Sequence, residues 1–534
     1  MKTRIQKLNE MDKVIQEIAK DLGLDWFPQE FDVIPERKMI ELLAYRFPRN
    51  FSHWSFGRDF EFERTKHDYG FGIPYEVVLN TNPSRAFLIN INPFPIQVLV
   101  MAHVYAHNNF MKNNIHFAPT RRDVLTSVSS AATRFREYEE IYGLDEVEKI
   151  IDAGMALQYN TNFDFFIKDG TEERSERLKY QKTKKRDPLD DFFPKKPDGK
   201  EYKKRQKECL RRTPMEPDRD ILLYIIKNAP LEDWQKDILS VIRDQMRYLY
   251  PQMRTKIMNE GWATYWHMRI MNRLFEQGYL TAEDHGYYSL YNSRVLAMNK
   301  YHLNPYIVGL KIWEDIEDRW NKGKFGKEYR ECDDLRVKEK WDKKLGLGKE
   351  KIFKVRDTYS DRFFFEEFLT EKLVDDLDLY IYASIEHPDG SITDIIIEDD
   401  WQVIKRLLVQ AHTTFGIPHI EVTDGNYKGR RELYLKHLFE EAPLDPEYRE
   451  KTMEHIYDLW QNPVHLETVE IELKIPEDRL AILSDIFGSI PQKILDELGI
   501  DKKEKGVIYT YDGKKHTVWE IELKRNKNSQ LRLS

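Results

Sequence analysis

The chain has 534 residues, a formal net charge of −8, and 33% charged against 41% hydrophobic residues. This length exceeds what a single hydrophobic core supports, so two or three domains are expected in a protein with a highly charged surface. The negative net charge excludes the electrostatic signature of a general nucleic-acid-binding protein.

Cysteine usage and hydropathy exclude further classes. Cys209 and Cys332 lie in charged segments without a CxxC partner, which argues against a thiolate zinc site and a disulfide framework. The N-terminal segment is charged throughout and lacks the apolar region of a signal peptide. The longest apolar stretch, residues 96–104, is too short to cross a bilayer. We therefore expect a cytoplasmic protein without a membrane span.

The first 160 residues show mainly helical periodicity. Two strand-like runs flank the turn sequence Asn-Thr-Asn-Pro-Ser, which predicts a hairpin over residues 75–90. Helices are predicted over residues 1–22, 38–46, 95–112 and 120–160, the last with a stop at Gly143.

Residues 168–216 differ from the sequence on either side. They are strongly charged, contain prolines and have few aliphatic residues. This composition indicates a solvated insertion, and the alternative is a basic docking patch for an acidic protein partner.

Helical periodicity returns at Asp218 and continues to about Trp320. Pro251 is expected to follow one helix and to open the next. The predicted helices cover residues 219–228, 231–250, 259–267, 282–299 and 305–320.

The C-terminal third alternates between strands and helices. Residues 377–400 and 417–438 each predict two strands joined by a turn. Helices are predicted over residues 401–415, 446–461 and 477–498, and further strands over 469–475 and 518–524. The expected fold is a mainly α N-terminal body with a smaller α+β C-terminal part. The expected domains are residues 1–322, a linker or exposed hairpin at 323–350, then 351–468 and a C-terminal extension at 469–534.

The sequence Asn-Glu-Gly-Trp-Ala-Thr-Tyr-Trp-His at residues 259–267 places three polar groups on one helix face. Glu260, Thr264 and His267 stand at i, i+4 and i+7. A carboxylate, a hydroxyl and an imidazole are costly to bury without partners. The segment therefore indicates a metal or acid–base site, and the alternative is an aromatic core helix with a buried polar network.

A second segment supplies partners for the first. His103 and His107 are one helical turn apart, the spacing with which helical zinc sites bind one ion from one face. Val104 occupies the position at which an HExxH motif carries its general base, so a ligand pair is present without the usual base. Packing and hydrogen bonding are the alternative roles for the two histidines.

Glu260 is the expected third ligand, which would give a zincin-like helical site for Zn²⁺ or another divalent cation. Gly261 next to it costs a helix about 1 kcal/mol relative to alanine, which predicts the close approach of another backbone. His267 lies about 10.5 Å further along the axis, so it is assigned with Thr264 to supporting, catalytic or substrate contacts. Lower-ranked candidates are His53, His67, Glu137, Glu139, Glu140 and Asp152.

Several strings in the chain resemble the SpoVR family, named for stage V sporulation protein R. They occur in order over residues 1–470, at 53–57, 75–83, 100–114, 136–143, 231–267, 304–309, 432–437 and 459–468. The most specific are His-Val-Tyr-Ala-His-Asn-Asn-Phe from His103 and the segment 259–267. The chain differs at Asn109 and Gln245, where the family more often carries carboxylates.

The resemblance implies an association with formation of the spore cortex, a peptidoglycan layer, or with related stress physiology. It implies no reaction. Two hypotheses follow: a metal-dependent hydrolase or amidase-like enzyme acting on cell-wall precursors or peptides, and a non-catalytic regulator or scaffold that docks partners through residues 168–216 and the C-terminal part.

Overall fold

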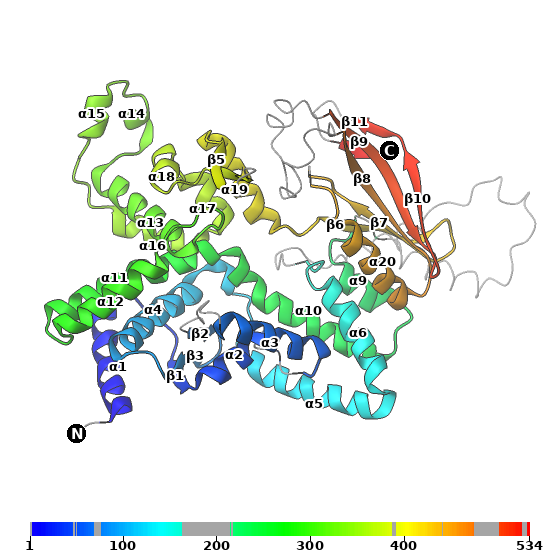
Figure 1. Ribbon diagram of the computed structural model, residues 1–534, viewed down its shortest axis with the longest axis horizontal. Helices are drawn as coiled ribbons and strands as arrows, with labels where there is room; N and C mark the ends of the chain where they lie inside the picture. Colours follow the sequence, from blue (N-terminus) through cyan, green and yellow to red (C-terminus); the bar gives the residue numbers. More distant parts are fainter. Residues whose placement is uncertain are drawn as a thin grey trace, which may run out of the picture. The chain divides into compact units, whose positions relative to one another are not determined.

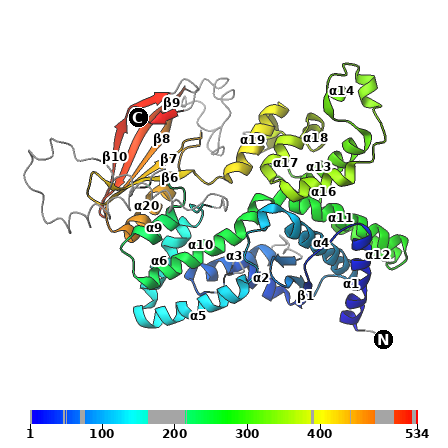
Figure 2. The ribbon, with the colours of Figure 1, turned by 180° about the vertical axis from the view of Figure 1, so that it is seen from behind.

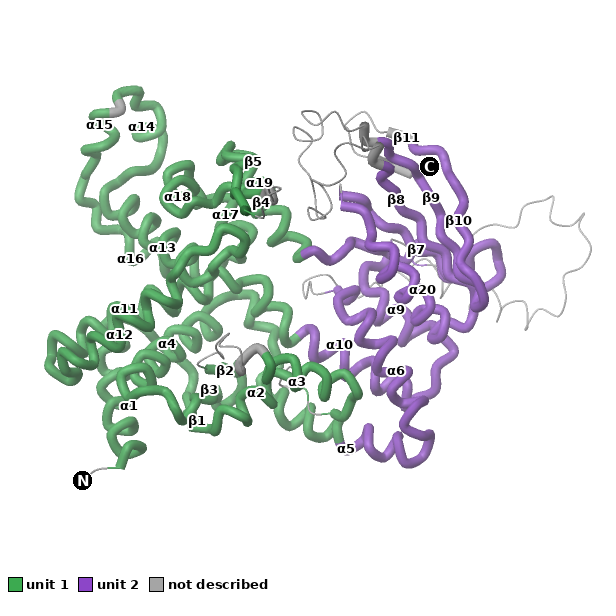
Figure 3. The backbone as a smooth tube through the Cα atoms, in the orientation of Figure 1, with its two compact units in different colours: residues 1–132, 248–415 green, residues 133–247, 416–534 purple. Residues whose placement is uncertain are grey.

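The computed structural model describes residues 3–45, 49, 51–68, 76–162, 214, 217–386, 391–440, 442–474, 501–525 and 531–533. They form two compact units, each assembled from two separate stretches of chain (Figure 3). Unit 1 comprises residues 1–132 and 248–415, and unit 2 comprises 133–247 and 416–534. The domain boundaries expected from the sequence are drawn differently and stay a prediction.

Two expectations fall outside the described residues. These are the charged insertion at 168–216, apart from Pro214, and the helix expected at 477–498. The remaining description confirms the expected fold class, with a mainly helical body and a sheet near the C-terminus (Figure 1).

Unit 1 begins with helix α1 (Arg4–Asp21), as the periodicity predicted. A capping box starts it: the Thr3 side chain accepts from the Gln6 amide, and the Gln6 side chain accepts from the Thr3 amide. The apolar face, including Leu8 and Ile15, is buried in the core of this unit. Helices α2 (Glu36–Ala44) and α3 (Trp54–Asp68) follow.

A three-stranded sheet in unit 1 has the order β1-β3-β2. The predicted hairpin is confirmed, because β2 (Glu76–Leu79) pairs antiparallel with β3 (Ser84–Ile89). Strand β1 (Gln29–Ile34) pairs parallel with β3, a contact that no hairpin signal announces. The first residue of β2, Glu76, is thereby fixed opposite Leu88.

Two long helices run side by side in unit 1 (Figures 1 and 2). Helix α4 (Phe94–Asn113) is buried on nearly all sides, and α11 spans Lys256–Glu276. No side chain at the N-cap of α11 satisfies its first amides. Instead the buried Asp361 carboxylate accepts from the backbone amides of Ile257 at 2.8 Å and Met258 at 2.9 Å. This contact fixes the N-terminus of α11 from a distant part of the chain.

Helix α13 (Pro305–Lys322) crosses α11 in backbone contact. A Cβ added to Gly261 would lie 2.3 Å from the carbonyl carbon of Gly309, and one added to Gly309 would lie 2.2 Å from the Ile257 oxygen. The predicted close approach at Gly261 is confirmed. The approaching backbone belongs to α13, and not to the helix that carries the two histidines.

The rest of unit 1 is largely helical. The strand pair expected within residues 377–400 is confirmed as β4 (Ile381–Glu386) and β5 (Ile392–Glu398), which pair antiparallel. Two short helices, α14 (Gly326–Arg330) and α15 (Leu335–Glu339), lie within residues 323–350. The other elements are the 3-10 turn η1 (Ile115–Phe117), α12 (Ala282–Val295), α16 (Gly348–Thr358), α17 (Asp361–Phe368), α18 (Glu371–Asp376) and α19 (Trp401–Thr414).

Unit 2 contains a five-stranded sheet in the order β10-β9-β8-β7-β6. The predicted pair of strands at 417–438 is confirmed as β6 (Ile420–Tyr427) and β7 (Glu432–His437). Strand β7 pairs parallel with β8 (Val464–Lys474), and the crossover helix α20 (Pro446–Trp460) joins them. Strand β9 (Asp501–Tyr511), which the sequence did not predict, pairs antiparallel with β8 and with β10 (His516–Ile521).

The remaining elements of this part of the chain are α6 (Leu144–Leu157), α9 (Ile221–Asn228), β11 (Leu523–Arg525) and β12 (Leu531–Leu533). Helices α5 (Val124–Tyr142) and α10 (Asp233–Arg254) each contain residues of both units. The predicted stop at Gly143 is confirmed, since it separates α5 from α6 with φ 92°.

The expectation for Pro251 is wrong. The proline lies inside α10, which continues to Arg254. Pro251 and the nearby Tyr248 are buried. A proline inside a helix removes one backbone hydrogen bond, and α10 continues past Pro251 all the same. Among the described helices, none combines the length and the apolar character needed to cross a membrane.

Candidate metal centre

Three elements of unit 1 bring four ligand-type side chains together. His103 and His107 come from α4, Glu260 from α11 and Glu76 from β2. The Glu260 Oε2 lies 3.5 Å from the Nε2 atoms of both histidines. The Glu76 Oε1 lies 3.7 Å from His103 Nε2, and one ligand atom each of Glu76, His103 and His107 all lie within 4.8 Å of one another. The three predicted ligands therefore do converge.

These separations test whether a cation fits. Bonds of about 2.0–2.1 Å in a tetrahedral site place ligand atoms about 3.4 Å apart, close to the separations observed here. The same separations are too long for good hydrogen bonds. Within the part of the chain that the structure describes, His103 Nε2 and Glu260 Oε2 are buried without a hydrogen-bond partner. The donor set of two imidazoles and two carboxylates suits Zn²⁺ or a similar divalent ion.

The other nitrogen of each histidine ligand is held by a neighbour. His107 Nδ1 lies 2.9 Å from Asn259 Oδ1. His103 Nδ1 lies 2.9 Å from His267 Nδ1, and His267 Nε2 lies 3.1 Å from Asn292 Oδ1. Because an amide oxygen only accepts, His107 carries its proton on Nδ1 and His267 carries its proton on Nε2.

This protonation pattern continues to the remaining ligand. The His267 Nδ1 has only a lone pair, so it accepts the proton of His103 Nδ1. In their neutral forms both ligand histidines then present the lone pair of Nε2 toward the two glutamates. A hydrogen bond from the non-coordinating nitrogen is the usual support of a metal-binding histidine, because it sets the tautomer and the ring orientation.

Electrostatics in the cluster reflect burial and close packing. Burial raises the pKa of Glu260, but the attraction of His107 and His103 outweighs it and leaves this pKa well below its ordinary value. Burial lowers the pKa of His107, but Glu260, with help from Asn259 and Glu76, shifts it above its ordinary value. Burial raises the pKa of Glu76 against the attraction of both histidines. Burial and the neighbouring His103 lower the pKa of His267 to about 3, so it is neutral at pH 7.

The cluster opens into a cavity of about 720 Å³. Glu76, His103, His107, Glu260 and His267 all line it, so the ligand-type atoms face a space large enough for a small molecule. The rest of the wall comes from α4, β2, the junction of α10 and α11, the end of α12 and the start of α13.

The other predicted site residues are placed differently. Thr264 is fully buried, does not line the cavity, and its hydroxyl has no hydrogen-bond partner among the described residues. His53 is buried near the start of α3, with Nδ1 2.8 Å from Ser55 Oγ, and it does not line the cavity either. The side chain of His67 lies outside the description. The lower-ranked carboxylates Glu137, Glu139, Glu140 and Asp152 belong to unit 2, whereas the cluster belongs to unit 1.

Sequence reasoning missed Glu76, Asn259 and Asn292. Glu76 opens a short strand of Val-Val-Leu, and a carboxylate at the edge of an apolar strand was the available signal. Asn259 directly precedes Glu260, so its place on the same helix could have suggested a contact with the histidines. Asn292 carried no signal, because α12 meets α4 only in the folded chain.

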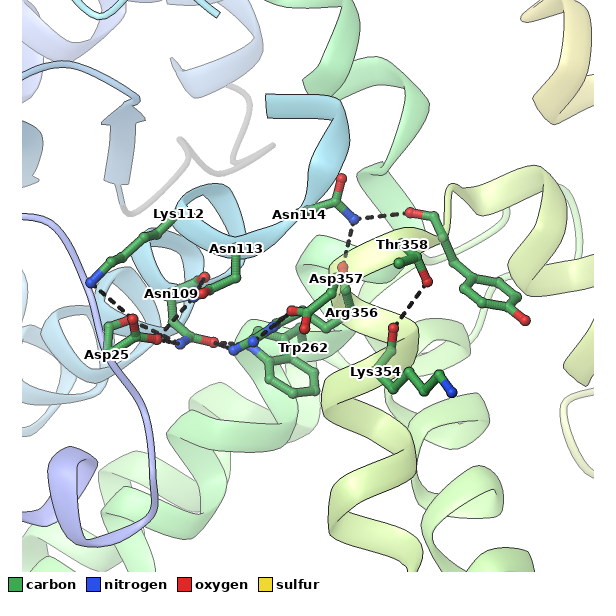
Figure 4. Close-up of polar contacts among 11 residues, drawn as sticks. Asp25, Asn109, Lys112, Asn113, Asn114, Trp262, Lys354, Arg356, Asp357 and Thr358 are labelled. Atoms are coloured by element: carbon green, nitrogen blue, oxygen red, sulfur yellow. Dashed lines mark hydrogen bonds and ion pairs between the residues drawn. The ribbon is translucent and has the colours of Figure 1, made fainter. Parts of the chain in front are cut away.

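A second buried polar cluster is centred on Asn109 of α4 (Figure 4). Asn109 of α4 accepts at Oδ1 from Trp262 Nε1 at 3.0 Å and from Arg356 Nη1 at 2.8 Å. Its Nδ2 donates to the backbone oxygen and to Oδ1 of Asp25. Every hydrogen-bonding position of this amide is thus used, and the cluster joins α4 to α11 and α16.

Comparisons with known proteins agree with this architecture. Residues 2–417 match the family described as SpoVR like protein, and residues 418–471 match the SpoVR-like C-terminal domain. The chain is 31% identical over 479 residues to a protein of Escherichia coli (strain K12) named "Uncharacterized protein YcgB", covering 85% of this chain and 90% of the relative. No solved structure matches the chain.

The two matched segments meet at residues 417 and 418, close to the point at which unit 1 gives way to the C-terminal stretch of unit 2. The first contains the cluster of Glu76, His103, His107 and Glu260, and the second contains strands β6 and β7. Matches of this extent, with the relative covered over almost its whole length, show that the chain belongs to the SpoVR family.

Proposed function

We propose that this SpoVR-family protein is a metal-dependent hydrolase of amide bonds. One observation carries the proposal: side chains from three separate elements converge at 3.5–3.7 Å and face a cavity, and the buried His103 Nε2 and Glu260 Oε2 have no hydrogen-bond partner among the described residues. A divalent cation held there would polarise a carbonyl oxygen and make a water molecule more acidic. His103, His107 and Glu260 form the ligand set, the two-imidazole and one-carboxylate combination of catalytic zinc sites.

Glu76 takes the role of general base in this proposal. Val104 leaves the usual helical position of that base without a carboxylate, and the Glu76 Oε1 reaches the same ligand atoms from β2. In the reaction, water adds across the amide C–N bond. Glu76 accepts the proton of the water and returns it to the leaving nitrogen, so that an acid and an amine are released.

His267, Asn259 and Asn292 act as positioning residues. They hold the two imidazoles in the tautomer that turns Nε2 toward the cavity. Thr264 has no contact with the cavity and takes no part in this proposal.

The substrate class follows from the family association with a peptidoglycan layer. Peptidoglycan precursors and peptides contain amide bonds, and a cavity of about 720 Å³ is of the size that holds a small molecule or a short peptide. The competing proposal is a non-catalytic regulator or scaffold in which the same residues form a structural polar network. It is the weaker one, because a structural network needs partners for the buried His103 Nε2 and Glu260 Oε2.

Metal analysis tests the proposal. Purified protein reconstituted with Zn²⁺ and dialysed should retain about one ion per chain. The variants His103→Ala and Glu260→Gln should retain none, whereas His285→Ala, an exposed histidine of α12, should behave as the unchanged protein. Substitution with Co²⁺ should give the visible absorption of a four-coordinate ion.

The variant Glu76→Gln distinguishes a general-base role of Glu76 from a role as metal ligand. It should keep the ion and lose release of amine from peptide substrates by a factor of about 10² or more. Loss of the ion in this variant would make Glu76 a ligand. Absence of stoichiometric metal in the unchanged protein after reconstitution would overturn the proposal.

A further inference from the structure

The cavity has two chemically different ends because α4 and α11 run antiparallel. His107 meets Asn259 and His103 meets His267, so residues later in α4 face residues earlier in α11. Met111 therefore lies toward the end lined by Gln252 and Lys256, while Leu99 and the residues before it lie toward the opposite end. The ligand-type side chains stand between the two ends.

The first end carries a positively charged side chain, Lys256. Lys256 is exposed, opens α11, and is the only lysine or arginine among the residues described as lining this cavity. It stands four residues before Glu260, on the same helix face and about 6 Å along the axis. A lysine side chain at this place reaches over the cavity wall without competing for the ligand positions.

The charge of the wall favours an anion once the site is loaded. Glu76 and Glu260 are the carboxylates of the lining and Lys256 is the ammonium, so the wall has an excess of one negative charge. A bound divalent cation reverses this excess to one positive charge. An anionic group is then attracted by the net positive charge of the wall and also by direct contact with the Lys256 ammonium.

The second end is apolar. It is lined by Ile96, Leu99 and Val100 of α4, and the apolar side chains Val295 and Pro305 also line the cavity. Aliphatic surface of this kind binds an acyl chain or an aliphatic side chain by burial. The polar side chains Asn304 and Tyr306 line the cavity as well, and the ring centroid of Tyr306 lies 6.1 Å from that of His103.

We propose that the cavity selects amides whose acyl part is apolar and whose amine part carries a carboxylate. Substrates of this class are N-acyl amino acids and peptides cleaved before their last residue or two. Lys256 binds the carboxylate, and the apolar end holds the acyl part. The spacing agrees, because an extended residue spans about 3.3–3.6 Å, so a carboxylate at Lys256 is one or two residues from the reacting carbonyl. This selection rests on the proposed function of the same site.

The test measures binding with a probe that cannot be cleaved. It is the ketomethylene analogue of N-octanoylglycine, in which a methylene group replaces the amide nitrogen, and its neutral partner is the corresponding primary amide. Calorimetry with the Zn²⁺-reconstituted protein should give at least about tenfold tighter binding of the carboxylate, the range for a hydrogen-bonded charge pair. Lys256→Met should remove this preference and leave binding of the neutral amide unchanged, and Lys256→Arg should keep most of it.

Lys13→Met, which neutralises an exposed lysine of α1 outside the cavity, is the matched control and should change nothing. Equal binding of the two probes, no binding of either, or an equal loss for both in Lys256→Met would overturn the selection. The metal content of each sample is measured in parallel. A protein that binds metal but shows no carboxylate preference refutes only the selection, whereas one that prefers the carboxylate without binding metal refutes only the proposed function.

Discussion

Two buried polar clusters lie on neighbouring turns of α4, and they differ in how their atoms are satisfied. Around Asn109, both amide lone pairs and both amide protons have partners at 2.8–3.0 Å. In the other cluster, the Nδ1 atom of His103 has a partner at 2.9 Å in His267. Its Nε2 atom and the facing Glu260 Oε2 have no hydrogen-bond partner among the described residues.

Both clusters connect α4 to α11, but their buried polar side chains serve different roles. A satisfied network stabilises one arrangement of helices. A cluster whose inner atoms converge without bonding each other is arranged to bind something else. The following variants test this difference, and they are ordered by the size of the expected effect.

The largest effect is expected for Asn109→Leu. The variant removes the acceptor of Trp262 Nε1 and of Arg356 Nη1, while Nε and Nη2 of Arg356 keep their bonds to Asp357. The free energy of unfolding should fall by about 3–5 kcal/mol, with or without metal. Urea denaturation measures it, with Asn113→Ala at the edge of the same network as a control that should cost about 1 kcal/mol. A metal-dependent loss in Asn109→Leu would contradict the structural role of this cluster.

Glu260→Gln should abolish stabilisation by metal. At a Zn²⁺ concentration of 100 Kd, the unchanged protein should gain about 2.7 kcal/mol in its free energy of unfolding, and the variant should gain none. The metal-free variant should also be less stable at pH 7, because the lowered pKa of Glu260 means that folding favours its ionised form, which glutamine lacks. Denaturation with and without a chelator measures both quantities. Retention of the full metal-dependent gain in the variant would contradict the role of Glu260 as a ligand.

Asn292→Ala should weaken the metal centre through His267. Without the amide oxygen at 3.1 Å, the Nε2 proton of His267 loses its acceptor, which weakens the preference for the tautomer that supports His103. The affinity for Zn²⁺ should fall about tenfold, the lower end of effects from such supporting residues, which corresponds to about 1.4 kcal/mol. Competition with a chromophoric chelator measures it. An unchanged affinity for Zn²⁺ would show that the contacts from Asn292 through His267 do not orient His103.

The smallest effect, taken over the first pH unit below 6.5, is a pH dependence of the metal-free protein. The folded pKa of His267 is lowered to about 3 from its ordinary 6.5, so below pH 6.5 the unfolded chain binds a proton that the folded chain does not. This contribution is complete above pH 6.5, and stability is lost as the pH falls toward 3, by about 1 kcal/mol over the first pH unit. His267→Gln should flatten the profile in this window, whereas His285→Gln, an exposed histidine, should not. If His267→Gln and the unchanged protein lost stability equally between these pH values, His267 would not be the cause of the pH dependence.

The sequence by itself determined most of the helices and the hairpins. Helix α4 is predictable because apolar residues dominate its first half, and the β2–β3 turn is predictable from Asn-Thr-Asn-Pro-Ser. These signals are local, since they depend on propensity and on spacing along one element. The sequence also placed His103 and His107 on one face of a helix and singled out Glu260 as a partner.

Only the tertiary structure decided the long-range arrangement. Strand β1 pairs parallel with β3, and strand β9 pairs antiparallel with β8. Neither the sequence of β1 nor the lysine-rich start of β9 predicts which strand it pairs with. Each unit combines two distant stretches of chain for the same reason. Pro251 shows the opposite case, in which a local signal for a helix boundary is wrong because α10 continues through the proline.

The candidate site follows the same division. Residue types and helical spacing along α4 and α11 were sufficient to propose His103, His107 and Glu260, because a turn of helix fixes which side chains share a face. Glu76 and Asn292 could not be assigned, because a strand edge and another helix reach the cluster only when the chain is folded. Whether a buried polar group is satisfied, as Asn109 is, or left facing a cavity, as Glu260 is, depends on atoms distant in sequence, and only the fold brings them together.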